Sequence, residues 1–262
     1  MTSSTPAGRF RMSRCLQVGL LGATIVAGLA CGTKDAPDPI GPTGPVGRVR
    51  FVNLITNSAL VPVDVALEGV PFGVNLGYGA TTPASLPAPA AAFYSPIYTG
   101  PRTMVLRRTA DVSVTVATLN FTVAEDVDHT VYAIGGAGAT PVTSLVITDE
   151  IPAPAATEVR FRVVNMSTAA VDVFITASGA DLATATPVAT NVAPQTGSPY
   201  VVLAPGTWQI RTVPAGTAPA ARTAAVNMTA AGTFAGGTAR TIVVATNNAG
   251  NPPLMGIVLS DR

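Results

Sequence analysis

Hydrophobic and polar residues alternate in short segments along most of the chain. The segment VPVDVAL, which begins at Val61, places its four larger apolar residues on one face of a strand and Asp64 on the other. The segment DVSVTV, which begins at Asp111, repeats this pattern. Such segments are rich in Val, Ile and Thr and are separated by Gly, Pro and Asn. Beyond the N-terminal segment none has a sustained helical period, so we expect an all-β protein.

Two further strand segments show where the alternation shifts. In RVRFVNLI, which begins at Arg48, we expect Val49 and Phe51 to face the core, with Leu54 facing inward after a shift. After Val116 the apolar positions change parity and continue at Leu119, Phe121 and Val123. A one-residue slip would turn these side chains outward. We therefore expect a β-bulge or a break near Ala117 and Thr118.

Corresponding segments occur in the same order in both halves of the sequence. RFVN at Arg50 corresponds to RVVN at Arg162. Further pairs follow in order: PVDVAL and AVDVFI, HTVYAI and RTIVVA, and LVITD and IVLSD. We interpret this order as a tandem duplication of a domain of about 100 residues.

The duplication predicts the domain organisation. We expect two tandem immunoglobulin-like β-sandwich domains of about seven strands each, over residues 48–150 and 158–262. The segment IPAPAAT, residues 151–157, joins them. A short Pro- and Ala-rich linker permits limited reorientation, so we expect the two sandwiches to fold independently.

The N-terminal 30 residues have the pattern of an export signal. Arg9, Arg11 and Arg14 precede the uncharged apolar stretch Leu16–Ala30. This stretch is shorter than the roughly 20 apolar residues that span a membrane. We therefore interpret residues 1–30 as a signal peptide.

Cys31 follows this stretch in the tetrapeptide GLAC, which resembles the lipobox of bacterial lipoproteins. Cys15 would be removed with the signal peptide, so Cys31 would be the one cysteine of the mature chain. We expect Cys31 to be the lipid attachment site, with residues 31–47 as a Pro- and Gly-rich tether and the protein exported to the outer membrane or cell surface. The alternative is ordinary secretory cleavage, with Cys31 as a bystander.

Several of the repeated positions together resemble the bacterial domain of unknown function 4397 family. The pattern is R-x-x-N, then V-D-V, then Asn, then a Pro/Gly turn that leads into an alternating strand. It is carried by Arg50, Asn53, Val63, Asp64, Val65 and Asn75, and by Arg162, Asn165, Val171, Asp172, Val173, Asn191, Pro205, Gly206 and Trp208. The resemblance implies an exported β-sandwich module, often in tandem and often behind a lipoprotein signal. It implies no established chemistry.

Composition and motifs offer little support for catalysis. The formal net charge is +1, so there is no electrostatic case for a nucleic-acid partner. One His and two Cys cannot supply a zinc-ligand pattern. The sequence also lacks a nucleophile elbow, a phosphate-binding loop and a dinucleotide fingerprint. We expect no catalytic site, no metal and no cofactor.

The single histidine has two interpretations. His129 follows Glu125, Asp126 and Asp128, so it could act as a base or join these acids in a cation site. In the other half Arg240 occupies the corresponding position, and the preceding loop lacks a carboxylate. We therefore favour an exposed strand entry next to a solvated loop.

The remaining candidates for ligand contact are acids and aromatic rings. Asp64 and Asp172 are the same residue in both halves, and they either contact a ligand or cation or pair across the sheet with Arg50 or Arg162; we favour the pairing. Exposed rings are typical of sugar-binding platforms. The candidates are Tyr94 and Tyr98, together with Tyr78, Phe93 and Tyr200.

These observations favour a non-catalytic lipoprotein of the cell envelope. Its role would be structural, adhesive or protein-interacting, with the membrane as partner through lipidated Cys31 and an envelope protein or glycan as a further partner. The alternative is a carbohydrate- or peptide-binding module that uses loops at one end of a sandwich or an exposed sheet edge.

Overall fold

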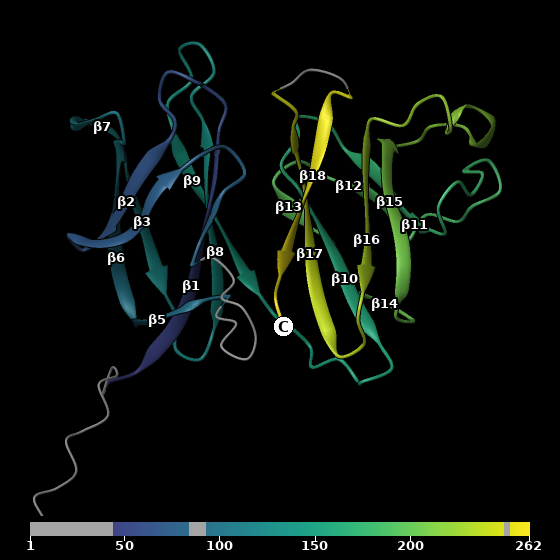
Figure 1. Cartoon of the computed structure of the whole chain (residues 1–262), viewed down its shortest axis with the longest axis horizontal. Helices are drawn as coiled ribbons and strands as arrows, with labels where there is room; N and C mark the ends of the chain where they lie inside the picture. Colours follow the sequence, from purple (N-terminus) through teal and green to yellow (C-terminus); the bar gives the residue numbers. More distant parts are fainter. Residues whose placement is uncertain (1–43, 84–92, 249–251) are drawn as a thin grey trace, which may run out of the picture. The chain divides into compact units, whose positions relative to one another are not determined.

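The computed structural model describes residues 44–83, 93–248 and 252–262. Within these ranges the chain is all-β, with strands in four sheets, one short 3-10 turn at Pro219–Ala221 and no α-helix (Figure 1). The signal peptide, Cys31 and most of the tether predicted from the sequence lie outside the described residues. We call strands β1–β9 the N-terminal half and strands β10–β18 the C-terminal half.

Two sheets make up the N-terminal half. In the first, the strand order is β4 (Thr81–Thr82), β1 (Val46–Ile55), β8 (Asp128–Gly135) and β9 (Thr143–Asp149), with β5 (Ser95–Tyr98) also paired to β1. In the second, the order is β3 (Val70–Leu76), β2 (Val63–Leu67), β6 (Gly100–Arg108) and β7 (Asp111–Val123).

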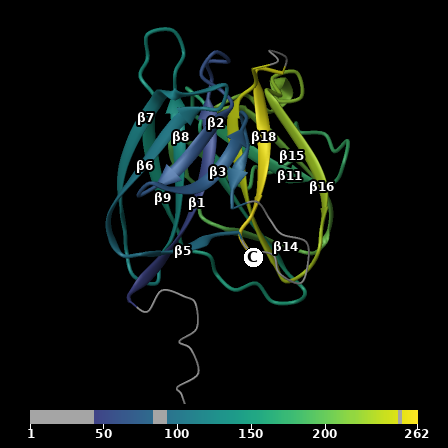
Figure 2. The ribbon, with the colours of Figure 1, turned by 60° about the vertical axis from the view of Figure 1, so that its left-hand side comes forward.

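The C-terminal half repeats this arrangement. Its first sheet has the order β13 (Thr196–Gly197), β10 (Val159–Asn165), β17 (Thr238–Thr246) and β18 (Leu254–Ser260), with β14 (Val201–Leu203) also paired to β10. Its second sheet has the order β12 (Ala189–Val192), β11 (Val171–Thr176), β15 (Gly206–Pro214) and β16 (Met228–Phe234). Strands β15 and β16 run side by side in both views (Figures 1 and 2).

Each half therefore has nine strands in the described residues, where the sequence predicted about seven. The difference comes from short segments beside the first strand of each half. β4 and β5 both pair with β1, and β13 and β14 both pair with β10. In both halves the chain crosses this edge as two short strands instead of one long one.

One parallel pairing distinguishes each half. β1 runs parallel to β8, with Arg50 opposite Thr130, and β10 runs parallel to β17, with Arg162 opposite Thr241. The other strand pairs are antiparallel. The matching register makes Arg50 and Arg162 structurally equivalent, as their sequence motifs predicted.

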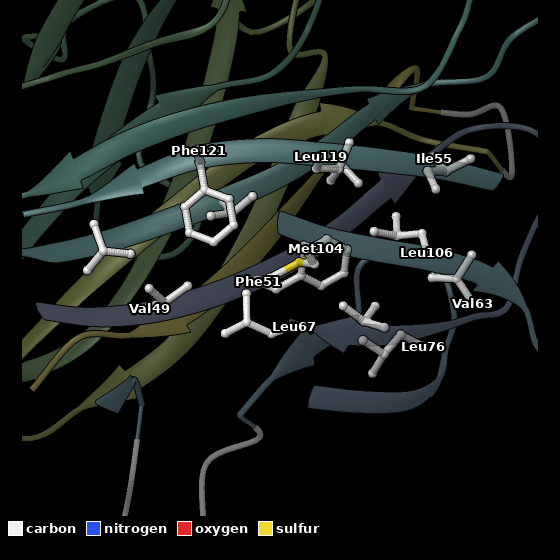
Figure 3. Packing of buried hydrophobic residues seen from close by; sticks show 14 residues of the cluster. Val49, Phe51, Ile55, Val63, Leu67, Leu76, Met104, Leu106, Leu119 and Phe121 are labelled. Carbon is white, nitrogen blue, oxygen red and sulfur yellow. The ribbon is translucent and has the colours of Figure 1, made fainter. Parts of the chain in front are cut away.

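An apolar core lies between the two sheets of the N-terminal half. Phe51 from the first sheet meets Leu67 and Met104 from the second (Figure 3). The alternation predicted for β2 is confirmed, because Val63, Val65 and Leu67 are all buried. The C-terminal half has an equivalent core, in which the rings of Phe161 and Phe234 meet edge to face, with centroids 4.8 Å apart.

The shift of register in β7 occurs one residue before the predicted position. Leu106 is opposite Ala117, whereas Arg107 is opposite Thr115, so Val116 is the extra residue of a bulge. Beyond it Leu119, Phe121 and Val123 are buried, as expected. Before it the prediction fails at Val112, whose exposed fraction is 56%.

A further apolar cluster joins the two halves. Strand β1 is buried at every position from Val49 to Ile55, because both of its faces are covered. Val49 and Phe51 face the core of their own half, whereas Val52 and Leu54 pack in a cluster with residues of the other half. The buried members of this inter-half cluster are Val52, Leu54, Tyr132, Val164, Val243, Ala245 and Leu259. From the Pro- and Ala-rich linker we expect limited reorientation of the two halves. The shared cluster, which the linker sequence does not indicate, restrains this reorientation.

Candidate functional site

The two repeated aspartates hold turns of their own half. The Asp64 carboxylate accepts hydrogen bonds from Asn75 N at 2.8 Å and Thr109 Oγ1 at 2.6 Å. The Asp172 carboxylate accepts from Asn191 N at 2.8 Å and Gly216 N at 3.1 Å. The predicted pairing with Arg50 or Arg162 is wrong.

The asparagines bonded to these acids have a special backbone. Asn75 and Asn191 have positive φ values of 56° and 50°, a left-handed conformation that few residue types adopt readily. Each lies in a short edge strand, within a register shift of its pairing with the strand that carries the aspartate, and the aspartate carboxylate of its own half accepts a hydrogen bond from its N–H. Asp64 and Asp172 thus recur in both halves because each holds a left-handed asparagine at an equivalent irregularity of the sheet.

The asparagines of the two R-x-x-N motifs are also used internally. Asn53 is buried and donates from Nδ2 to Leu76 O at 2.9 Å. Asn165 is buried and donates to Val192 O at 2.8 Å. Each side chain therefore ties the first strand of its half to the segment that contains the left-handed asparagine.

The arginines of these motifs belong to a buried group that we call the Arg–Asp cluster: Arg50, Thr130 and Asp149 from the N-terminal half, and Arg162, Thr241 and Asp261 from the C-terminal half. Within the N-terminal half, Arg50 Nη2 donates to Thr130 Oγ1 at 3.0 Å, and this hydroxyl donates to Asp149. Within the C-terminal half, Arg162 Nε donates to Thr241 Oγ1 at 2.8 Å, and Thr241 donates to Asp261 at 2.7 Å. The two triads have the same connectivity.

The shortest ion pairs of the cluster cross between the halves, whereas Arg50 Nη2 lies 3.6 Å from Asp149 Oδ2 of its own half. Arg50 Nη2 lies 3.0 Å from Asp261 Oδ1, and Arg162 Nη2 donates to Asp149 Oδ1. Arg50 also donates to Ser260 O at 2.9 Å. The carboxylates of Asp149 and Asp261 are fully buried. Burying these four charges requires pairing, because removing one would leave its partner uncompensated in a low-dielectric interior.

Two tyrosines complete the cluster. The Tyr94 hydroxyl donates to Asp149 Oδ2 at 2.8 Å, and its ring centroid lies 4.5 Å from the Arg50 guanidinium. The Tyr200 hydroxyl donates to Asp261 Oδ2 at 3.1 Å, and its ring centroid lies 5.2 Å from the Arg162 guanidinium. Each half thus contributes one tyrosine that bonds an aspartate and stacks near an arginine.

Burial and charge pairing shift the pKa values in this cluster. Burial alone lowers the pKa of both arginines, but the neighbouring Asp149 and Asp261 carboxylates outweigh it, so the pKa values of Arg50 and Arg162 are raised. Burial raises the pKa values of Tyr94 and Tyr200. These groups therefore keep one protonation state near neutral pH, which suits a structural junction more than proton transfer.

The aromatic residues do not form an exposed platform. Tyr94 has an exposed fraction of 7% and is committed to the Arg–Asp cluster, so it is not available as a ligand platform. Tyr78 donates to Thr246 O at 2.6 Å across the halves, and burial raises its pKa to about 12. Tyr98 is exposed, at 48%. Tyr94 and Tyr98 are candidate ligand contacts together in the sequence, but in the structure Tyr94 is buried and Tyr98 is exposed.

His129 is buried, and the exposed strand entry expected for it is wrong. Its Nε2 accepts a hydrogen bond from Ala124 N at 3.0 Å, which requires an unprotonated Nε2. Burial lowers its pKa. Asp128 instead pairs with Arg48, at 2.5 Å. In the described part of the chain, His, Cys, Asp and Glu form no group of three that could hold a metal ion.

A cleft of about 660 Å³ lies between the two halves. Its lining includes Leu54, Ile134, Met166 and Ala245, all members of the inter-half cluster or packed against it. Its lining also includes hydroxyl and amide side chains, and none of the described residues that line it is charged. Among the described residues, no helix is long and apolar enough to cross a membrane.

A comparison with protein families matches about half of the chain. Residues 47–176 match the family model described as Domain of unknown function (DUF4397). The matched DUF4397 region extends past the linker, from β1 to the end of β11, and so includes Arg50, Asp149 and Arg162.

Other comparisons add little. Comparison with curated proteins found no match. One similar solved structure is described as alpha-glucan recognition by family 41 carbohydrate-binding modules from streptococcal virulence factors. It is 8% identical, with 75% of this chain and 93% of that chain covered and a TM-score of 0.24. A TM-score this low carries no argument about the fold or ligand of this chain.

Proposed function

We propose that this protein is a non-catalytic lipoprotein of the cell envelope, whose two tandem immunoglobulin-like sandwiches act as one structural unit for interaction with another envelope protein. The Arg–Asp cluster is the observation that carries the proposal. The polar residues that recur in both halves are committed to joining the halves or to fixing turns. A matched set of buried ion pairs is a means of fixing geometry, which suits a scaffold.

The anchoring part of the proposal rests on the sequence. The basic N-terminal residues, the apolar stretch Leu16–Ala30 and Cys31 have the order of a lipoprotein signal. Several acyl chains on Cys31 would hold the protein at the membrane stably, since one chain alone gives only marginal binding. The Pro- and Gly-rich residues after Cys31 would separate the sandwiches from the bilayer surface.

An exposed sheet edge supports a protein partner. Val70 and Val74 on β3 are each 65% exposed, and β3 is an edge strand of its sheet. Exposed apolar residues on an edge strand are a recurring feature of sites that bind another protein. The carbohydrate-binding alternative loses support, because Tyr94 is buried.

The anchoring is tested by mass spectrometry of the mature N-terminus from the native host. We expect an acylated Cys31 at the N-terminus and membrane-bound protein, whereas the Cys31→Ser variant should be released in soluble form. A mature chain with an unmodified Cys31 would contradict the proposal.

The interaction is tested by chemical crosslinking and affinity capture from the native envelope. We expect one stoichiometric protein partner, lost in a Val70→Ser, Val74→Ser double variant and retained in a Val202→Ser variant, which changes an exposed valine on the other half. Binding to a glycan array that depends on Tyr98 would instead favour the carbohydrate-binding alternative.

A further inference from the structure

The contacts between the halves are reciprocal. Arg50 of the N-terminal half meets Asp261 of the C-terminal half, and Arg162 of the C-terminal half meets Asp149 of the N-terminal half. Each half therefore carries both an arginine and the aspartate that an equivalent arginine would bind. A contact in which residue i meets j and j meets i is isologous, and such a face is complementary to a copy of itself.

The apolar part of this face is also built from equivalent positions. Val52 is opposite Tyr132 in the parallel pair of the N-terminal half, and Val164 is opposite Val243 in the parallel pair of the C-terminal half. All four side chains belong to the inter-half cluster. Tyr132 and Val243 therefore occupy equivalent places on the two faces that meet.

Two equivalent positions on β8 and β17 differ in size, both in the same direction. On β8, the N-terminal half presents Tyr132 and Ile134. At the corresponding positions on β17, the C-terminal half presents Val243 and Ala245. On these two strands the N-terminal half thus carries the larger side chains and the C-terminal half the smaller ones, while the charged part of the face is the same in both.

We infer that each half carries a self-complementary docking face whose partner is another copy of that face, and that Tyr132 and Ile134 against Val243 and Ala245 select the pairing of unlike halves. Two N-terminal halves would bring two tyrosines and two isoleucines together and overfill the contact. Two C-terminal halves would leave a gap where these side chains are missing. This pairing rule does not depend on membrane anchoring or on the envelope partner.

The first experiment uses the full chain with a protease site inserted in the linker, residues 151–157. The folded protein is cleaved, and the products are weighed by native mass spectrometry. We expect an N-terminal half and a C-terminal half held together as a one-to-one complex, with no complexes of like halves. Halves that separate on cleavage would overturn the inference of a docking face.

The second experiment changes the size rule. In the cleaved Tyr132→Val variant, both faces have a valine at this position, so we expect like-with-like complexes to appear beside the unlike pair. The matched control is Tyr98→Val, the same substitution at an exposed tyrosine, which should leave only the unlike pair. If Tyr132→Val also leaves only the unlike pair, the size of this residue does not select the partner.

A residue swap provides a test of rescue. Val243→Tyr alone should weaken the association of the cleaved halves by at least about tenfold, because it adds a second large ring to the inter-half cluster that already holds Tyr132. Adding Tyr132→Val moves the large side chain to the other half and should recover most of the lost affinity. Losses that simply add in the double variant would show that the two positions do not complement each other.

Discussion

Arg50, near the start of β1, lies 3.0 Å from Asp261, the residue that directly follows the last strand of the chain. Both side chains are almost completely buried, so this ion pair ties the first strand to the C-terminal end. The equivalent pair of Arg162 and Asp149 joins the halves at the corresponding place. The two pairs together make the stability of one half depend on the other.

Replacement of Asp261 by alanine should destabilise the protein strongly. The change leaves Arg50 buried with a weaker set of partners, and breaking a buried pair typically costs about 3–5 kcal/mol of unfolding free energy. Urea unfolding measured by circular dichroism gives this value. The control is Asp111→Ala, which removes the exposed partner of Arg108 together with two exposed hydrogen bonds from Ser113 and should lower the unfolding free energy much less. Equal effects of the two variants would contradict the role assigned to Asp261.

Two tyrosine-to-phenylalanine changes should have opposite effects. The Tyr132 hydroxyl is buried and has no hydrogen-bond partner in the described residues, so Tyr132→Phe should leave the unfolding free energy unchanged or raise it by up to about 1 kcal/mol. The Tyr200 hydroxyl donates to Asp261, so Tyr200→Phe should lower it by about 0.5–1.5 kcal/mol. Thermal unfolding of both variants beside wild type measures the difference in sign. A loss in both would show that the Tyr132 hydroxyl is paired in solution.

His129 should make the protein less stable in mild acid. Burial lowers its pKa in the folded state below the ordinary value of 6.5. The unfolded chain then binds more protons than the folded one as the pH falls from 6.5 toward the folded-state pKa, so stability is lost across that window and is fully present above it. Urea midpoints at pH 7.5 and pH 5.5 should differ more for wild type than for His129→Gln. An identical pH dependence for both would rule out this contribution.

The equivalent aspartates should differ in the effect of their removal. Asp172 is buried and its carboxylate bonds two backbone N–H groups, so Asp172→Ala should cost about 1–3 kcal/mol of unfolding free energy. Asp64 is only partly buried, so Asp64→Ala should cost less. Chemical unfolding of the two variants gives the comparison. A larger effect at Asp64 would show that burial does not set the cost.

The sequence predicted best those features that depend on local alternation. One face of β2 is buried as its period-two pattern indicated, and the bulge in β7 lies one residue from its predicted position. Both follow from a strand that is buried on one side and exposed on the other. Val112 departs from the pattern: it lies near the start of β7, before the bulge, and its side chain is exposed.

The junction between the halves was not predicted from the sequence because alternation of apolar and polar residues does not indicate it. RVRFVNLI and HTVYAI carry apolar residues at consecutive positions, which is typical of strands covered on both faces. The aligned segments LVITD and IVLSD contain Asp149 and Asp261, but alignment within the chain cannot say that each aspartate meets the arginine of the other half. That pairing depends on how two finished sheets pack, which no short segment encodes.

The reciprocal contact also limits how a chain of this kind can be lengthened. Each half uses its contact face on the other, so both faces are occupied when two halves are present. A head-to-tail interface would allow units to be added one by one, but an isologous one closes after two. A third copy of the repeated unit, appended to this chain, would have no partner for its contact face. Its arginine and aspartate, which are buried in the other two copies, would be exposed to water. Chains built on this plan should therefore gain halves in even numbers, or dimerise when the number is odd.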